Sequence, residues 1–189
     1  MRRTVIRSIS LFAIGVALAS CATLDKDECA VADWQQLGMS DGGRGVAATY
    51  VANHQKACSK YGLPVDTVAW QSGWQQGIRN YCTFENGIEV GKRSGYSSNP
   101  CPADLAADFQ TGVSAGSEVH QARSERDSAR SELNSLTAKL VKAPDPAEKA
   151  RIQLQIELTR TRLQTAEFAL LRAESSLQNT ILAHSLRRY

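Results

Sequence analysis

The chain has 189 residues, of which 22 are Lys or Arg, 19 are Asp or Glu, and 42% are hydrophobic. Residues 1–20 contain three arginines and no acidic residue, so the rest of the chain carries 19 basic and 19 acidic side chains. A chain without a basic surplus is a poor candidate for binding nucleic acid, and this apolar content excludes a disordered chain. No stretch after residue 20 reaches the roughly 18 consecutive apolar residues of a membrane-spanning helix, which excludes a polytopic membrane protein.

The first 20 residues are typical of a bacterial export signal. A basic segment, 1–7, precedes the short apolar segment 9–19, and Leu18-Ala19-Ser20-Cys21 closes it. Leucine, two small residues and cysteine resemble the lipobox of bacterial lipoproteins, in which the cysteine thiol is lipidated and becomes the N-terminus. We therefore expect residues 1–20 to be a lipoprotein signal peptide and Cys21 to be the lipidated residue. An ordinary cleaved signal and an uncleaved anchor helix are the alternatives.

The residue after this cysteine bears on localisation. Ala22 is not the aspartate that by resemblance marks retention in the inner membrane. We expect a protein anchored by its lipid to the periplasmic face of the outer membrane, with the outer leaflet of the inner membrane as the alternative. The membrane is then one partner of the chain.

Four further cysteines remain: Cys29, Cys58, Cys82 and Cys101. An even number of cysteines in an oxidising compartment favours two disulfides. Their wide spacing, and the scattered positions of the three histidines, do not match the ligand spacing of a zinc site. No C-x-x-C motif is present, so we expect neither reactive-thiol chemistry nor a metal or cofactor.

The pairing of these cysteines follows from a coarse assignment of helices. Residues 33–42 and 47–61 read as two helices joined by a glycine-rich turn. If they form an antiparallel hairpin, Cys29 before the first helix meets Cys58 near the end of the second. This predicts Cys29–Cys58 and Cys82–Cys101, each bridge stabilising by roughly 2–4 kcal/mol, while two other connectivities stay open.

Glycines follow a repeated pattern, and after residue 20 all of them lie at or before Gly116. An aromatic residue is followed by glycine after two residues and by a second glycine four positions later, in Trp70-x-x-Gly73-x-x-x-Gly77, Phe84-x-x-Gly87-x-x-x-Gly91 and Phe109-x-x-Gly112-x-x-x-Gly116, with Trp34, Gly38 and Gly42 as a looser copy. Both glycines fall on one helix face, and each costs about 1 kcal/mol relative to alanine. We therefore expect another helix backbone to pack directly on these faces.

The order of these residues resembles the Gram-negative lipoprotein family known as domain of unknown function 2799, from about Cys29 to Gly116. The resemblance is carried by Asp33-Trp34, Gly38, Asp41-Gly42, Gly45, Cys58, Gly73, Gly77, Tyr81-Cys82, Asn86-Gly87, Gly91, Gly95-Tyr96, Cys101-Pro102, Phe109 and Gly112. A tyrosine expected near Phe109 is missing. Because the family has no established activity, the resemblance implies only a periplasm-facing lipoprotein with a cysteine-bearing head and a helical tail.

The last 73 residues contain no glycine and predict a helical hairpin. Two runs repeat apolar residues at alternating three- and four-residue spacing, which is the pattern of coiled-coil seams. They are Val119, Ala122, Arg126, Ala129, Leu133, Leu136 and Leu140, then Ile152, Ile156, Thr159, Leu163, Ala166, Leu170, Ala173 and Leu177. Ala143-Pro144-Asp145-Pro146 breaks the helix between the runs, with Asp145 as the cap of the second.

These features predict an all-α protein. Residues 1–20 form the signal peptide, 21–116 a head of short glycine-rich helices braced by two disulfides, and 117–189 a long antiparallel, coiled-coil-like helical hairpin. The seam at 152–186 could also pair between molecules, but the break at residues 144–146 favours pairing within one chain first. The oligomeric state stays open.

No constellation of catalytic residues is evident. Asp33, Asp41 and Glu85 lie near expected helix ends, where capping explains an acid, and His54 stands alone in a helix. We expect a non-enzymatic envelope scaffold or interaction protein, with an unidentified protein partner and no nucleic acid. The alternative is a binding module for a periplasmic glycan or peptide, which would expose two of Trp34, Trp70 and Trp74 in a groove.

Overall fold

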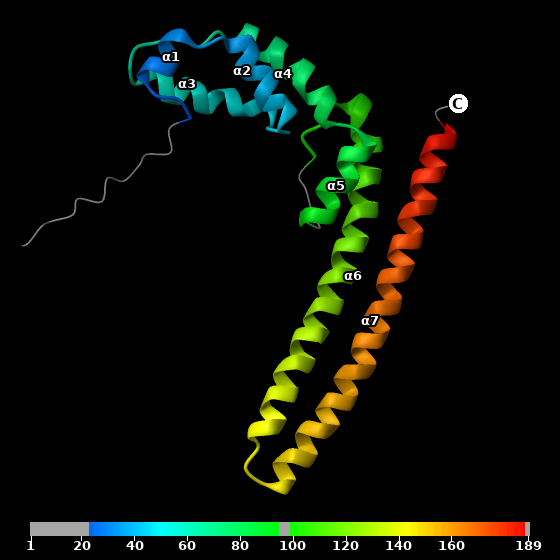
Figure 1. Ribbon diagram of the computed structural model, residues 1–189. Coiled ribbons are helices and arrows are strands. Elements are labelled where there is room, and N and C mark those ends of the chain that lie inside the picture. The colour runs from blue at the N-terminus through cyan, green and yellow to red at the C-terminus, as the bar shows by residue number, and fades with distance from the viewer. Residues whose placement is uncertain (1–22, 95–98, 188–189) are drawn as a thin grey trace, which may run out of the picture.

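The computed structural model describes residues 23–94 and 99–187, and this part of the chain is helical throughout, without a strand (Figure 1). The elements are α1 (Lys26–Val31), α2 (Trp34–Gly43), the 3-10 turn η1 (Ala48–Tyr50), α3 (Val51–Ser59), α4 (Thr67–Tyr81), α5 (Phe84–Ser94), α6 (Ala103–Lys142) and α7 (Pro146–Arg187). The predicted fold class, an all-α head with two disulfides followed by a long helical hairpin, is confirmed. The predicted signal peptide and Cys21 lie outside the described residues.

The helices begin at short polar side chains, which accept hydrogen bonds from backbone N–H groups that have no partner within the first turn. Asp33 accepts from the N–H of Gln36 at 3.0 Å at the start of α2, and Asp66 caps α4 in the same way. At the start of α7, Asp145 accepts from the N–H of Glu148 at 2.9 Å, and proline is the first helical residue. The predicted break and cap at residues 143–146 are therefore confirmed.

Glycines bring helices together in two pairs, α2 with α4 and α5 with α6. A Cβ atom on Gly73 would lie 1.9 Å from the carbonyl oxygen of Gln35, and one on Gly112 would lie 2.2 Å from that of Phe84. Neither position has room for a side chain. The predicted backbone-to-backbone contact is confirmed, and it occurs on every helix that carries the motif.

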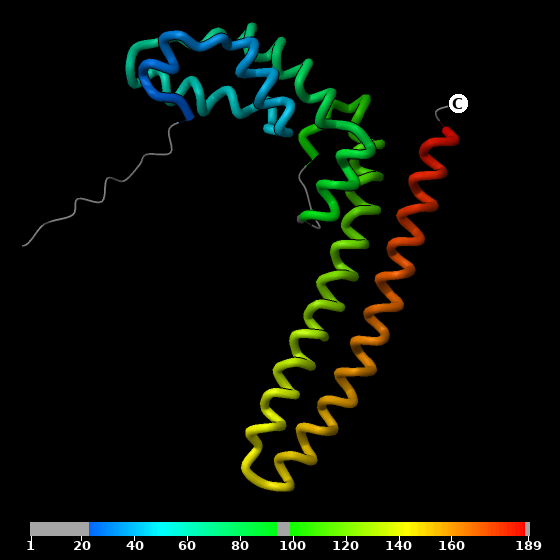
Figure 2. The backbone as a smooth tube through the Cα atoms, in the orientation of Figure 1, coloured from blue at the N-terminus to red at the C-terminus, as the bar shows by residue number. Residues whose placement is uncertain are grey.

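Both glycine pairs are parallel. Gly38 lies against Trp70 while Gly42, one turn later, lies against Trp74, and the contacts between α5 and α6 advance in the same direction. A parallel pair needs a connection that returns the chain to the starting end. Residues 44–66, which include α3, make this return in the first pair (Figure 2).

The two disulfides occupy equivalent places in these pairs. Cys29, which precedes α2, is bonded to Cys58 on the returning α3; Cys82, which precedes α5, is bonded to Cys101 just before α6. Each bridge therefore ties the start of a glycine pair to its returning connection. The head is built from two copies of one unit. In each unit a cysteine precedes the first glycine-bearing helix, and the second cysteine lies in the connection that leads to the second glycine-bearing helix.

The expected disulfide pairing is confirmed, but part of the reasoning behind it is corrected. Cys29 lies within α1, a six-residue helix with a capping box at Asp25 and Glu28 that the hydrophobic pattern did not reveal. In addition, α2 packs mainly on α4, and its contacts with α3 are few. The bridge forms because α3 returns beside the start of the unit.

The rings of the motif form the core of the head. Trp70 and Phe109 are fully buried, and the rings of Trp70 and Trp74 stack with centroids 6.4 Å apart. The two units meet where Tyr81, at the end of α4, packs on Phe109 of α6 at 5.4 Å between ring centroids. The Cys82–Cys101 bridge closes the same junction.

The hairpin is formed by α6 and α7, which run antiparallel side by side (Figures 1 and 2). Its seam is the predicted one: Leu136 packs with Ile152 and Ile156 near the turn, and Ala122 with Leu170 and Leu177 nearer the head. Arg126, the polar seam residue, is half-buried and paired with Asp127 at 2.7 Å. Three ion pairs cross between the helices: Arg123–Glu174, Arg130–Glu167 and Arg162–Glu132.

The hairpin and the head share a helix. The last glycine motif, residues 109–116, and the first hairpin seam lie in the same unbroken α6, so the boundary expected after residue 116 falls inside a helix. Among the described residues, none of the helices is long and apolar enough to cross a membrane.

We predict that Gly77→Ala will destabilise the head by about 3 kcal/mol or more, because its Cβ atom would lie 2.0 Å from the carbonyl oxygen of Met39 and force α2 and α4 apart. Gly43→Ala is the matched control, since a Cβ atom there meets nothing within 4 Å and alanine favours a helix by up to about 1 kcal/mol. Urea unfolding followed by circular dichroism measures both. Similar losses of stability in the two variants would contradict direct backbone packing.

Candidate functional site

Asp41 is a fully buried carboxylate in the last turn of α2, and three elements direct donors at it. The indole Nε1 of Trp70 on α4 donates to Oδ2 at 3.0 Å, and Nε2 of His54 on α3 lies 2.8 Å from the same oxygen. The guanidinium of Arg44 donates to Oδ1 from the end of α2. A buried charge needs such partners, and here they join three helices around one group.

His54 extends this cluster toward the N-terminal end of the described chain. The residue is 2% exposed, its ring packs edge-on against Tyr50, and its Nδ1 lies 3.0 Å from Oγ1 of Thr23. Because the carboxylate of Asp41 only accepts, Nε2 donates to it, and the partner of Nδ1 is the hydroxyl of Thr23, which also lies 3.4 Å from the carbonyl oxygen of Asn53. The described chain is thereby bonded to the head from its first residue.

Hydroxyl, imidazole and carboxylate stand here in the order of a catalytic triad, but with the ring reversed. In Ser-His-Asp triads the carboxylate holds Nδ1 and the hydroxyl lies at Nε2, where substrate also has access. His54 offers no such open side, because it is buried and both ring nitrogens are engaged. The geometry suits a structural joint between α2, α3, α4 and residue 23 better than general base catalysis.

The sequence predicted part of this cluster. Asp33 caps α2 as expected. The capping interpretation of Asp41 is wrong, because the residue lies inside the last turn of α2 and is the centre of a buried network. His54, expected to stand alone, is brought to Asp41 by the packing of α3. The adjacent Gly42 was the sequence signal for the burial of Asp41, because it places the carboxylate beside the glycine face of α2, which packs on another helix.

The tryptophans belong to the core. Trp70 is 0% exposed and Trp74 is 7% exposed, and the Nε1 atom of Trp74 donates to the carbonyl of Val46 at 2.7 Å. Trp34 is half-buried and packs against the same cluster. These three rings therefore do not line an exposed groove.

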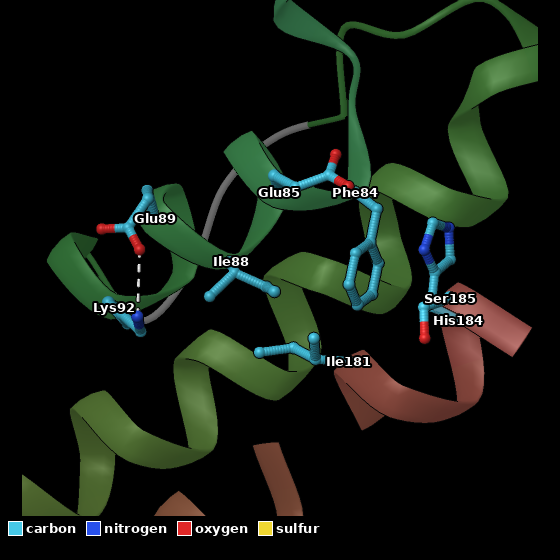
Figure 3. A pocket seen from close by; sticks show the side chains of 8 residues that line it. All are labelled: Phe84, Glu85, Ile88, Glu89, Lys92, Ile181, His184 and Ser185. Atoms are coloured by element: carbon cyan, nitrogen blue, oxygen red, sulfur yellow. Dashed lines mark hydrogen bonds and ion pairs between the residues drawn. The ribbon is translucent and has the colours of Figure 1, made fainter. Parts of the chain in front are cut away.

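A second candidate site is a groove between α5 and the end of α7, with a volume of about 630 Å³ (Figure 3). Its apolar lining comes from Phe84 and Ile88 on α5 and Ile181 on α7. The ring of His184 stacks on that of Phe84, with centroids 3.9 Å apart and planes at 9°. The groove was not predicted, because its walls are about 100 residues apart in sequence and meet only once α7 has returned along α6.

The rim of this groove carries charges of both signs. Lys92 is paired with Glu89 at 2.9 Å on this rim, and Nε2 of His184, which also lines the groove, lies 3.7 Å from Oδ2 of Asp108 outside it. An apolar floor with a mixed rim suits an apolar side chain of a protein or peptide. No group of three or more metal-binding side chains occurs in the part of the chain that the structure describes.

One known protein family matches part of the chain. Residues 33–118 match the family described as protein of unknown function (DUF2799), which confirms the resemblance to that domain over this segment. The matched segment holds all four glycine helices and ends within α6, before the hairpin seam. None of the curated proteins matches the chain, and neither does any solved structure.

We predict that Asp41→Ala will destabilise the protein by about 3 kcal/mol or more, because it leaves the Trp70 indole and the His54 imidazole buried without an acceptor. Asp33→Ala, which removes only an exposed helix cap, is the matched control and should cost about 1 kcal/mol. Thermal and urea unfolding measure both. An Asp41→Ala loss no larger than that of the control would refute the structural joint.

Proposed function

We propose that this protein is a non-enzymatic scaffold of the bacterial envelope, anchored through lipidated Cys21 and facing the periplasm from the outer membrane. The lipobox-like sequence Leu18-Ala19-Ser20-Cys21 supports the anchor. The continuity of α6 is the observation that carries the scaffold role. One helix of 40 residues, about 60 Å long, is part of the second head unit at one end and of the hairpin at the other.

Several contacts stiffen this connection. At its start, α6 is held to α5 through glycines and to the end of α4 through Cys82–Cys101. Beyond residue 118, α7 packs along it with a continuous seam and three ion pairs. A hairpin attached in this way extends from the head as a rigid arm, because bending it would break an α-helix.

The geometry at the N-terminal end fits an anchored molecule. Thr23, two residues after Cys21, is already bonded to His54 in the head. A lipid on Cys21 would therefore hold the head near the membrane surface without a long linker. The turn between α6 and α7 lies at the opposite end of the molecule from α1 (Figure 1). An anchored head would present this turn away from its own attachment point.

The alternative function, a glycan- or peptide-binding module that uses the aromatic head, has weaker support. Binding through Trp34, Trp70 and Trp74 would require rings that now pack in the core to become accessible. A peptide side chain would find more room in the groove beside Phe84 and His184. Such binding is compatible with a scaffold role and does not replace it.

We predict that Cys21→Ser will abolish incorporation of labelled palmitate and release the protein from the membrane fraction. The double variant Cys82→Ser/Cys101→Ser is the control: it removes one disulfide and costs roughly 2–4 kcal/mol of stability, but it should keep the label. Retention of Cys21→Ser in membranes through an uncleaved segment would contradict the lipoprotein proposal.

We also predict that a photo-crosslinking amino acid at Val141, near the hairpin turn, will capture envelope proteins in living cells. Val68 on α4 is the matched control, because the two valines are almost equally exposed, at 84% and 80%. Adducts from position 141 and not from 68 would support the rigid arm as the presenting element. Adducts from position 68 alone would assign the interaction to the head.

A further inference from the structure

One face of α7 is apolar and exposed, although the helix already buries its other face against α6. Large hydrophobic side chains that are well exposed are concentrated on this helix: Leu154, Leu158, Phe168, Leu171, Ile181, Leu182 and Leu186, at 37–68% exposure. Five of them belong to a stripe that repeats every three or four residues opposite the buried seam. The outer stripe comprises Leu154, Leu158, Thr161, Thr165, Phe168, Arg172, Ser175, Asn179, Leu182 and Leu186, all exposed.

The corresponding face of α6 is different. It carries Ser124, Ser128, Ser131 and Ser135, all exposed, at the positions where α7 carries leucine, threonine and phenylalanine. A solvent-facing helix of a free hairpin has no need of such apolar residues, which occupy the two ends of the stripe and, with Phe168, its centre. This difference between the two helices indicates that the outer face of α7, and not that of α6, is the interaction surface.

The outer stripe is symmetric about Leu170. Leu154 and Leu186 lie equally far on either side of it, as do Leu158 and Leu182. Polar residues occupy the next matched positions, Thr161 with Asn179 and Thr165 with Ser175, and at the centre Phe168 matches Arg172. Such a stripe suits an antiparallel pair of identical helices. A two-fold axis at Leu170 places each residue of one copy opposite the residue of the second copy that lies equally far on the other side of Leu170.

We propose that two copies of this protein pair antiparallel through the outer stripe of α7, with the two-fold axis near Leu170. Each end of the contact is then leucine on leucine, and each Phe168 ring receives the Arg172 guanidinium of the second copy, which is a favourable cation–π arrangement. The stripe spans residues 154–186 and is about 48 Å long. The pairing does not depend on the lipid anchor.

Polar atoms within the stripe do not oppose this contact. The hydroxyls of Thr161 and Thr165 already donate to carbonyl oxygens four residues earlier in α7, at 3.2 and 3.0 Å, so their burial leaves no donor unsatisfied. Of the nearest flanking charges, Arg162 is paired with Glu132 of its own chain and would lie opposite Gln178 of the second copy. This register brings one pair of like charges near the two-fold axis: the two Arg172 residues lie about 6 Å apart along the helix axes, each opposite Phe168 of the other copy.

The shape of the surface also fits. A shallow hollow of about 560 Å³ lies between α6 and α7, lined by Leu158, Thr161 and Thr165 on the stripe side. In the antiparallel register, Leu182 of the second copy lies opposite Leu158. Its side chain would enter this hollow in the manner of a knob in a hole.

Cysteine crosslinking in cells that produce the full chain tests the register. In the double variant Thr165→Cys/Ser175→Cys, each new thiol faces its counterpart on the second copy, and mild oxidation should give a covalent dimer on a non-reducing gel. The other described cysteines are already in disulfides. Neither single variant should crosslink, because identical residues would be separated by about 15 Å along the axis.

Each outcome decides the proposal. A dimer from Thr165→Cys alone would indicate parallel pairing and overturn the antiparallel register, and no dimer from the double variant would overturn pairing through this face. Adding Phe168→Glu to the double variant should lower the crosslinked fraction by at least about tenfold, whereas Ser131→Glu on α6 should not. Both sites are exposed, so melting temperatures should stay unchanged.

A membrane surface is the competing occupant of the stripe. Phe168→Trp in the full chain, reconstituted in vesicles of phosphatidylethanolamine and phosphatidylglycerol, reports on this through quenching by brominated acyl chains. Strong quenching without crosslinking of the double variant would replace the second copy by lipid as the occupant of the stripe. Crosslinking without quenching supports the dimer.

Discussion

Direct contact between helix backbones at glycine is the constraint on which the arrangement of the head depends. In both glycine pairs the positions facing the partner helix have no room for a Cβ atom, so the helices approach more closely than side-chain packing allows. Because each pair is parallel, the chain must return between its two helices. Both disulfides fasten that return to the start of the unit. The head thus contains the same arrangement twice: two parallel helices in contact through glycines, a connecting segment, and a disulfide that fastens this segment.

Much of this could be predicted from the sequence, because periodic patterns report local geometry. The hairpin seam, the break at Pro144 and the burial of glycine faces such as that of Gly73 all follow from spacing alone. The sequence does not predict which helix packs on each glycine helix, because four helices carry nearly the same motif and any two of them could pair. Helix α1 was missed because six residues with one buried side chain, Cys29, leave no periodicity.

The candidate sites were harder to predict, since they lie between elements whose packing the sequence leaves open. Asp41 meets His54 only because α3 returns beside α2, and Phe84 meets His184 only because α7 is long enough to reach α5. The apolar residues on the outer face of α7 are present in the sequence, but spacing alone does not show that they stay exposed once the head and the hairpin have packed. The structure assigns Ile156 to the inner seam and leaves Leu158 outside.

The shared helix α6 also affects how the molecule opens. Separating α6 from α5 would disturb the packing of Val119 and Ala122 on Leu170, so the second head unit and the adjoining part of the hairpin form one cooperative block. The first unit is joined to this block only near the start of α6, through Tyr81, the Cys82–Cys101 bridge, the Arg79–Asp104 ion pair and the packing of Leu105 on the tryptophan cluster. Local unfolding should therefore divide the chain at residues 81–83, between two units of the same architecture, and not at the visible border between head and arm.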